Sequence, residues 1–207
     1  HVRSRRQRQM CIRDRCLSVD FLDLRAWIRS IDHFFLEAFM TNSAISNDQP
    51  VASAALRAVM GQYLTGVTIV TVTGPDNIPY GLTVNSFNSV SLTPPLILWS
   101  LDNRNDKLSL FHNCRGFAVN IMAADQLGIC QTFAAAENDR FSRCNWHFGG
   151  YGQPLLANSL ASLECRPWAE YDGGDHTIFV GEVMSITKAD GNAAAFFKGK
   201  LGQYGDQ

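Results

Sequence analysis

The feature that most constrains the fold is a succession of strand-like segments separated by gaps of only a few residues. Val67–Thr73 is β-branched at nearly every position, which favours a strand, and residues 74–77 read Gly-Pro-Asp-Asn, which is typical of a turn. A second strand is predicted over Tyr80–Leu92, and a third follows a Pro-Pro dipeptide over Leu96–Leu101. Parallel neighbours need a crossover of about a dozen residues or more, so these gaps favour antiparallel pairing.

The rest of the chain continues this pattern with few helices. A glycine-rich aromatic loop is expected over residues 138–153. The predicted helices are 52–64, 106–113 and 123–135, and the further predicted strands are 116–122, 160–171, 176–187 and 196–199. About six strands without regular crossover helices exclude a doubly wound sheet and favour a mainly β, antiparallel barrel with a few short flanking α-helices.

The strand predicted over residues 176–187 has the cleanest period of two. Its apolar side chains Ile178, Val180, Met184 and Ile186 fall on one face, together with Glu182. Such alternation is typical of a strand with one buried and one solvated face.

The charge distribution separates a basic N-terminal segment from a mildly acidic body. Residues 1–15 contain six arginines and one aspartate, although the whole chain has a formal net charge of -1. We expect 1–39 to be a non-native or disordered extension, 40–51 a polar leader that starts at Met40, and 52–207 a single domain. The alternative for residues 17–39 is an amphipathic helix that binds a membrane surface or a partner.

Composition excludes several classes of function. A net charge of -1 argues against a nucleic-acid binder, and no stretch of 18 or more residues is continuously apolar, so we expect no membrane span. The six cysteines form no CxxC pair in a chain of this size, which favours reduced thiols in a cytoplasmic protein. Cys144 and His147 have a C-x2-H spacing, but no second ligand pair lies at a zinc-like distance, so we expect no metal site.

Residues 81–95 carry the most informative polar pattern. They read GLTVNSFNSVSLTPP, a predicted strand rich in hydroxyl and amide side chains. Buried polar groups need partners, so this strand either exposes a polar face to solvent or contacts a polar aromatic ligand such as a flavin. The glycine-rich dinucleotide signature, the P-loop and the nucleophile elbow of hydrolases are all absent from the sequence.

Two loops add candidate binding groups. The loop 100–107 leads into a predicted helix, where backbone amides suit a phosphate and Arg104 or Lys107 would add charge-assisted bonds; the alternative is a solvated charged loop. The segment 173–176 reads Gly-Gly-Asp-His and lies between two predicted strands. Histidine is a common proton donor and acceptor in enzymes, which makes His176 a candidate, and Asp175 could fix its tautomer or cap the turn.

These residues together resemble the flavin reductase-like family, whose fold is the FMN-binding split barrel. The resemblance covers residues 55–202, and several ordered segments at consistent separations carry it. The matching segments are 65–71 (TGVTIVT), 81–95, 117–120 (FAVN), 125–126 (DQ), 133–134 (FA), 139–141 (DRF), 152–156 (GQPLL), 163–165 (LEC), 174–176 (GDH), 181–183 (GEV) and 196–199 (FFKG).

The resemblance implies a six-stranded antiparallel Greek-key split β-barrel that forms a homodimer and binds FMN or FAD near the subunit interface. It also implies NAD(P)H-dependent reduction of that flavin, which then serves a separate flavin-dependent monooxygenase. Other members of this fold, such as an oxidase with tightly held FMN or a flavin-binding sensor module, remain the alternatives.

The same resemblance suggests roles for individual residues. The isoalloxazine contacts carry over to Thr83, Asn85, Ser86 and Ser91, and His176, with Asp175 beside it, corresponds to the nicotinamide-side group. The phosphate loop departs from the Ser/Thr-rich version of the family, which leaves the choice between FMN and FAD open. The phosphate contacts carry over to Ser100, Asn103, Arg104, Asn105 and Lys107.

Overall fold

The computed structural model describes residues 49–136 and 139–205. The chain divides into two units, of which residues 52–207 form the one described below. The expected extension 1–39 and most of the leader 40–51 lie outside the described residues. Within the described part, no helix is long and apolar enough to cross a membrane.

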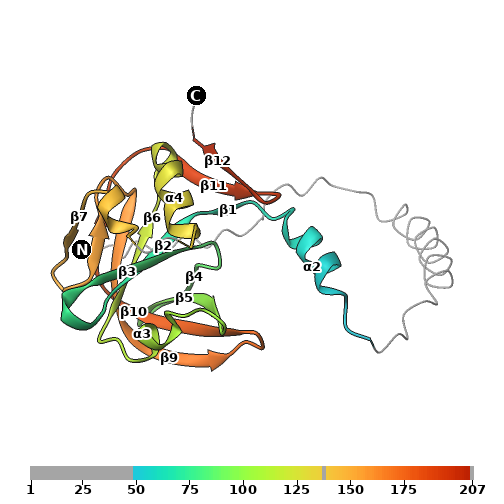
Figure 1. Ribbon diagram of the computed structural model, residues 1–207, viewed down its shortest axis with the longest axis horizontal. Coiled ribbons are helices and arrows are strands. Elements are labelled where there is room, and N and C mark those ends of the chain that lie inside the picture. Colours follow the sequence, from blue (N-terminus) through green and yellow to red (C-terminus); the bar gives the residue numbers. More distant parts are fainter. Residues whose placement is uncertain (1–48, 137–138, 206–207) are drawn as a thin grey trace, which may run out of the picture. The chain divides into compact units, whose positions relative to one another are not determined.

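A seven-stranded antiparallel sheet forms the body of the domain (Figure 1). Its strands follow the order β3-β2-β6-β9-β10-β5-β4, so neighbours in space come from distant parts of the chain. The β-branched sequence that predicts β2 lies in this sheet, between β3 and β6. The strands are β2 (Thr68–Thr73), β3 (Pro79–Val84), β4 (Asn88–Leu92), β5 (Pro95–Asp102), β6 (Phe117–Ile121), β9 (Ala161–Asp172) and β10 (His176–Lys188).

Smaller elements flank this sheet. A three-stranded sheet pairs β1 with β11 and β11 with β12, and a two-stranded sheet pairs β7 with β8. These strands are β1 (Thr65–Gly66), β7 (Trp146–Phe148), β8 (Pro154–Leu156), β11 (Ala193–Phe197) and β12 (Lys200–Tyr204). The helices are α2 (Ser53–Met60), α3 (Leu108–His112) and α4 (Leu127–Ala134), with 3₁₀ turns at Pro75–Asn77, Ala124–Gln126 and Phe141–Arg143.

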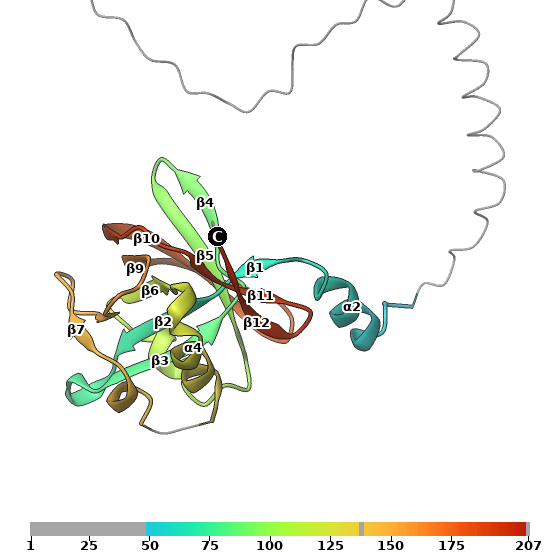
Figure 2. The ribbon, with the colours of Figure 1, turned by 90° about the horizontal axis from the view of Figure 1, so that it is seen from above.

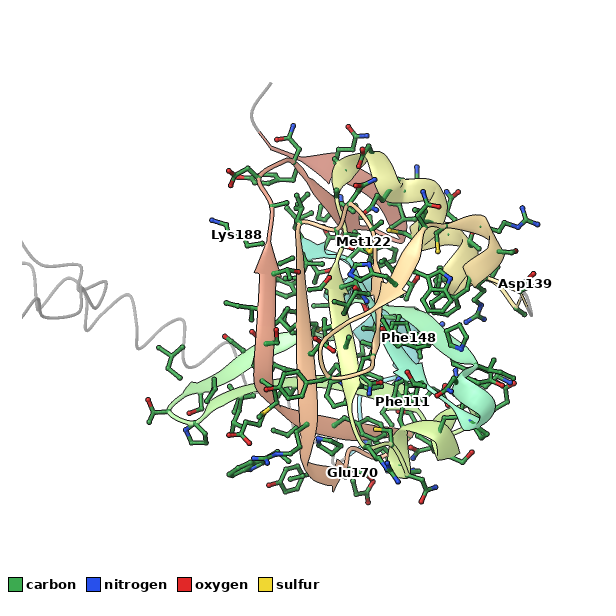
Figure 3. The ribbon with its side chains drawn as sticks, turned by 90° about the vertical axis from the view of Figure 1, so that its left-hand side faces the viewer. Phe111, Met122, Asp139, Phe148, Glu170 and Lys188 are labelled. Carbon is green, nitrogen blue, oxygen red and sulfur yellow. The ribbon has the colours of Figure 1, made fainter. Side chains whose placement is uncertain are left out.

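An aromatic cluster occupies one of the two hydrophobic cores. The indole of Trp99 stacks on Phe179 with ring centroids 4.8 Å apart, and Phe111 packs edge-on against Trp99 at 4.9 Å. The second core lies around Met122, between the sheet and α4. Phe111 and Met122 mark the two cores in Figure 3. Offset and edge-to-face contacts of this kind stabilise a core beyond the area they bury.

A buried polar network lies beside these cores. The side-chain amide of Asn120 donates to the carbonyl oxygen of Ile69 at 3.1 Å and to the hydroxyl of Thr71 at 3.2 Å. Its oxygen accepts from the Leu156 amide at 3.0 Å and from the Ser162 hydroxyl at 2.9 Å. Asn120 is fully buried and every bonding group on its side chain is used, as a buried amide requires.

The strand predicted over 80–92 divides into two strands. Residues 85–87 belong to neither β3 nor β4, and these two strands occupy opposite edges of the main sheet. The division explains why the sheet has seven strands where about six were expected. Figure 2 shows the β4–β5 hairpin projecting beyond the other strands.

The expected period of two in residues 176–187 is wrong. Phe179, Val180 and Gly181 are buried in succession, because the pairing of β10 with β9 shifts register after Val180 and again after Val183. A β-bulge redirects the side chains that follow it, so one face no longer collects every second residue.

The helical segments also differ from their predicted bounds. The helix expected over 52–64 ends at Met60, and none of its residues is buried. The helix expected over 123–135 is a 3₁₀ turn followed by α4. The expected loop 138–153 contains a 3₁₀ turn and β7, and the last strand expected over 196–199 is a hairpin formed by β11 and β12.

Candidate functional site

The site begins where β3 ends and the chain crosses towards β4. Asn85 and Ser86 lie in this break, and Asn85 is exposed and forms no hydrogen bond with any described residue. The hydroxyl of Ser86 donates to the Ser100 carbonyl oxygen at 3.2 Å and accepts from the Ser100 amide at 2.9 Å. Ser86 therefore connects residues 85–87, which form the break between β3 and β4, to Ser100 at the start of the 100–107 loop.

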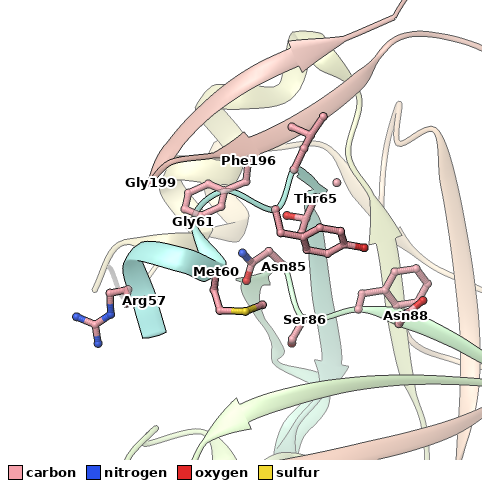
Figure 4. A pocket seen from close by; sticks show the side chains of 13 residues that line it. Arg57, Met60, Gly61, Thr65, Asn85, Ser86, Asn88, Phe196 and Gly199 are labelled. Carbon is pink, nitrogen blue, oxygen red and sulfur yellow. The ribbon is translucent and has the colours of Figure 1, made fainter. Parts of the chain in front are cut away.

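A cavity of about 680 Å³ opens at this break (Figure 4). Its lining is mostly apolar, with a few polar groups, a composition typical of small-molecule sites of this size. The hydroxyl of Thr65 is buried and has no hydrogen-bond partner in the described residues. The lining includes Met60, Tyr63, Thr65, Asn85, Ser86, Phe87 and Phe196.

The other two predicted isoalloxazine contacts are placed differently. The Thr83 hydroxyl donates to the carbonyl oxygen of Cys130 in α4 at 2.8 Å, and the Ser91 hydroxyl accepts from the Thr93 amide at 3.2 Å. Neither residue lines the cavity at the break. The structure thus brings Asn85 and Ser86 together there and leaves Thr83 and Ser91 bonded elsewhere.

The 100–107 loop is held by its own ion pairs. The Arg104 guanidinium contacts the Asp102 carboxylate at 2.6 Å and 3.0 Å, and the Arg104 amide donates to the same carboxylate at 2.8 Å. These hydrogen bonds hold the pKa of Asp102 well below its usual range. The Lys107 ammonium lies 2.8 Å from the Asp106 carboxylate and lowers the pKa of Asp106 in the same way.

The helix whose N-terminus is predicted to bind a phosphate is shorter than expected. Helix α3 begins at Leu108 and has only five residues, and the Leu108 amide already donates to the Asn105 carbonyl oxygen at 3.1 Å. The side-chain oxygen of Asn105 accepts from the Lys107 amide at 2.9 Å. The backbone amide at the start of α3 is therefore already bonded within the loop.

A second cavity, of about 770 Å³, lies along this loop. It is lined by Tyr80, Arg104, Asn105, Lys107 and Arg140, among others. The Arg140 guanidinium donates to the Gly81 carbonyl oxygen at 2.6 Å, and its Nε is buried without a partner in the described residues. Arg140 lies in the matched DRF segment, but the sequence pattern gave it no role.

The Gly-Asp-His turn lies directly beside the same loop. Nδ1 of His176 is 2.7 Å from the Asp175 carboxylate, and in the sheet His176 pairs with Asp102. The Asn103 amide donates to the Asp175 carbonyl oxygen at 2.9 Å. Residues from three separate sequence segments, 85–86, 100–107 and 174–176, are thus connected to one another.

No group of three or more potential metal-ligating side chains occurs among the residues that the structure describes. Cys144 donates its thiol to the Phe141 carbonyl oxygen at 3.9 Å, and burial raises its pKa. His147 lies on the short strand β7. The C-x2-H spacing therefore belongs to a segment without further ligands in the described structure.

Comparison with known proteins assigns the domain. Residues 60–205 match the flavin reductase like domain. The chain belongs to this family. The match includes the 100–107 loop, the Gly-Asp-His turn and every residue that lines the two cavities except Arg57 of α2.

Proteins similar to this flavin reductase-like chain are named as reductases. It is 40% identical over 156 residues to the FMN reductase (NADH) SmoA of Agrobacterium fabrum, covering 75% of this chain and 88% of that protein. It is 36% identical, also over 156 residues, to the reductase component of a 4-nitrophenol 4-monooxygenase/4-nitrocatechol 2-monooxygenase of Rhodococcus opacus, covering 75% of this chain and 83% of that protein.

The fold also matches solved structures. The NADH:FAD oxidoreductase SgcE6 of Streptomyces globisporus, in complex with NAD and FAD fragments, superposes with a TM-score of 0.71 at 38% identity. That match covers 76% of this chain and 95% of the other. The split-barrel fold expected from the sequence is therefore confirmed.

Proposed function

We propose that this protein is an NADH-dependent flavin reductase that supplies reduced FMN or FAD to a partner monooxygenase. The observation that carries the proposal is the cavity at the break between β3 and β4, which Ser86 joins to the loop beside His176. The family membership and the named reductase activities of the relatives support the same reaction.

The groups in this cavity fit a flavin ring. Its apolar side chains can cover the faces of a flat ring, whereas the unpaired Asn85 amide and the buried, unpartnered Thr65 hydroxyl can bond polar ring edges. The reaction itself is a hydride transfer between the two bound coenzymes. The chain contributes orientation and electrostatics, because proximity and a preorganised environment account for catalysis of this kind.

The remaining site residues bind and orient. Arg104 and Lys107 provide positive charge for the flavin phosphate, with Ser100 and Asn105 on the same loop. His176, oriented by Asp175, contacts the nicotinamide side. The names of the relatives, an FMN reductase (NADH) and an NADH:FAD oxidoreductase, support NADH as the hydride donor.

We propose further that the protein is a homodimer. The apolar side chains of α2 are all exposed, among them Leu56 and Val59, and Leu92 of β4 is 82% exposed. Large exposed apolar side chains are typical of subunit interfaces, and a second copy of this chain would cover them. Size-exclusion chromatography with light scattering tests this, and Leu92→Asp is expected to shift the mass towards the monomer.

We also propose that the protein is cytoplasmic. Cys114, Cys130, Cys144 and Cys165 are free thiols. Free cysteines are typical of reducing compartments.

Oxidation of NADH, followed at 340 nm with and without added FMN, FAD and riboflavin, tests the reaction. Turnover that rises with free flavin and saturates would establish the reductase and its preferred flavin. Flavin binding without any nicotinamide oxidation would refute the proposal and favour a split-barrel oxidase with tightly held FMN or a flavin-binding sensor module. Transfer of the reduced flavin is then tested by adding a monooxygenase component and measuring its product.

A further inference from the structure

Asn103 stands out because its polar groups contact the Gly-Asp-His turn. Its side-chain nitrogen donates to the Gly174 carbonyl oxygen at 3.1 Å, and its side-chain oxygen accepts from the Thr177 hydroxyl at 2.8 Å. Its backbone amide donates to the Asp175 carbonyl oxygen at 2.9 Å. Three hydrogen bonds therefore connect one residue of the 100–107 loop to three of the four residues 174–177.

The turn that receives these bonds is tightly constrained. Gly174 has a φ of 80°, a left-handed conformation that glycine adopts at low cost, and its amide donates to the Asp172 carboxylate at 2.9 Å. The Gly173 amide donates to the His176 carbonyl oxygen at 2.9 Å. His176 lies between Asp175 and Thr177, both of which Asn103 contacts, so Asn103 holds the backbone on each side of this histidine.

We propose that Asn103 is a positioning residue that holds the nicotinamide-side His176 at a set distance from the flavin-phosphate loop. This inference rests on the proposed function. It replaces the role of phosphate ligand that the family resemblance suggests for Asn103, because the bonds to Gly174 and Thr177 hold its side chain against the turn and Asn103 does not line the second cavity. Arg104 and Lys107, which do line that cavity, remain the proposed phosphate-binding residues.

The proposal predicts a specific kinetic signature. Asn103→Ala removes both side-chain bonds but keeps the backbone bond to Asp175. Both lost bonds are exposed and each contributes little, so we expect KM for NADH to rise about three- to tenfold. KM for the flavin is expected to change less than about twofold, because the phosphate-binding charges stay in place.

A second pair of variants tests the contact from its other end. Thr177→Val removes the hydroxyl donor at nearly constant volume and is expected to raise KM for NADH in the same direction, whereas Thr177→Ser keeps the donor and is expected to restore it. The combined Asn103→Ala, Thr177→Val variant is expected to lose less than the sum of the single effects, since both remove one shared bond.

Asn113→Ala is the matched control. Asn113 is also an exposed asparagine with one side-chain bond to a backbone carbonyl, from its nitrogen to the Ser109 oxygen at 2.9 Å, but it contacts neither the loop nor the turn. We expect this variant to leave both KM values unchanged. A raised KM for flavin with an unchanged KM for NADH in Asn103→Ala would overturn the proposal and make Asn103 a phosphate ligand.

Hydrogen exchange separates this inference from the proposed function. Asn103→Ala is expected to speed amide exchange in residues 173–177 and to leave the cores unaffected, whether or not the protein reduces flavin. Unchanged exchange there would refute the positioning role. Failure of the unaltered protein to oxidise NADH with any flavin would instead refute the proposed reaction.

Discussion

Asn120 allows a direct test of how much the buried hydrogen-bond network contributes to the free energy of unfolding. Asn120→Ala removes four buried hydrogen bonds, to Ile69, Thr71, Leu156 and Ser162. The Leu156 amide and the Ser162 hydroxyl are then left without their acceptor. A stranded buried group costs about 1–3 kcal/mol, and the cavity adds a smaller term, so we expect a loss of about 3–5 kcal/mol in the free energy of unfolding.

Urea unfolding followed by tryptophan fluorescence measures this loss. Trp99 is fully buried in the aromatic core and reports its opening. Asn113→Ala, which removes one exposed bond, is the control and should cost less than about 0.5 kcal/mol. Asn120→Asp separates the two halves of the network, because it keeps the oxygen that accepts from Leu156 and Ser162 and replaces the donating nitrogen with a second oxygen that can carry a charge.

The charge makes the stability of the Asn120→Asp variant depend on pH. Burial is expected to raise the pKa of the new carboxyl in the folded state, so its stability is highest in acid and falls as pH rises through the folded pKa. Asn120→Ala lacks this dependence. A loss below about 1 kcal/mol in Asn120→Ala would refute the view that the network is fully formed and closed to water.

Three further predictions concern the site, the core and the thiols. His176→Ala is expected to raise KM for NADH more than it lowers kcat, and complete loss of turnover at saturating NADH would contradict the assigned role. Gly181→Ala would place a Cβ 2.5 Å from the buried Phe117 ring and 3.0 Å from Cβ of Cys165, so urea unfolding should show a loss of about 1–3 kcal/mol; an unchanged midpoint would contradict the packing. Burial raises the pKa of Cys130 to about 11 and of Cys165 to about 12, so the neutral thiols favour the folded state. This contribution is complete below the ordinary thiol pKa near 9 and is lost as pH rises through the pKa values of the folded state. The urea midpoint should therefore fall above about pH 9. A constant midpoint would show that these thiols are not buried.

Local sequence signals predicted the elements that depend mainly on residue type. The β-branched run around Val70 forms β2, the turn between β4 and β5 lies at the Pro-Pro dipeptide, whose second proline begins β5, and the short helix that carries Phe111 is present as α3. Strand propensity and turn residues act over a few positions, so they can be read without knowing what packs against them.

Features that depend on distant partners could not be predicted in this way. The polar segment 81–92 divides because β3 pairs with β2 and β4 pairs with β5, and nothing within the segment itself specifies two partners. The bulges in β10 follow from its pairing with β9. The contacts of Asn103 join residues more than 70 positions apart, and Arg140 reaches Gly81 across 59 positions.

The polar residues of 81–92 show most clearly how sequence reasoning fell short. The sequence predicts solvent or a ligand as the partner of their hydroxyls, yet the Thr83 hydroxyl donates to the Cys130 carbonyl oxygen and the Ser86 hydroxyl donates to the Ser100 carbonyl oxygen. The protein's own backbone is a third partner, and it accounts for these two groups. In that cavity the buried Thr65 hydroxyl and the exposed Asn85 amide are without such a partner in the described structure. The case for a bound ring at this break therefore depends on these two unpaired groups rather than on the polarity of the strand as a whole.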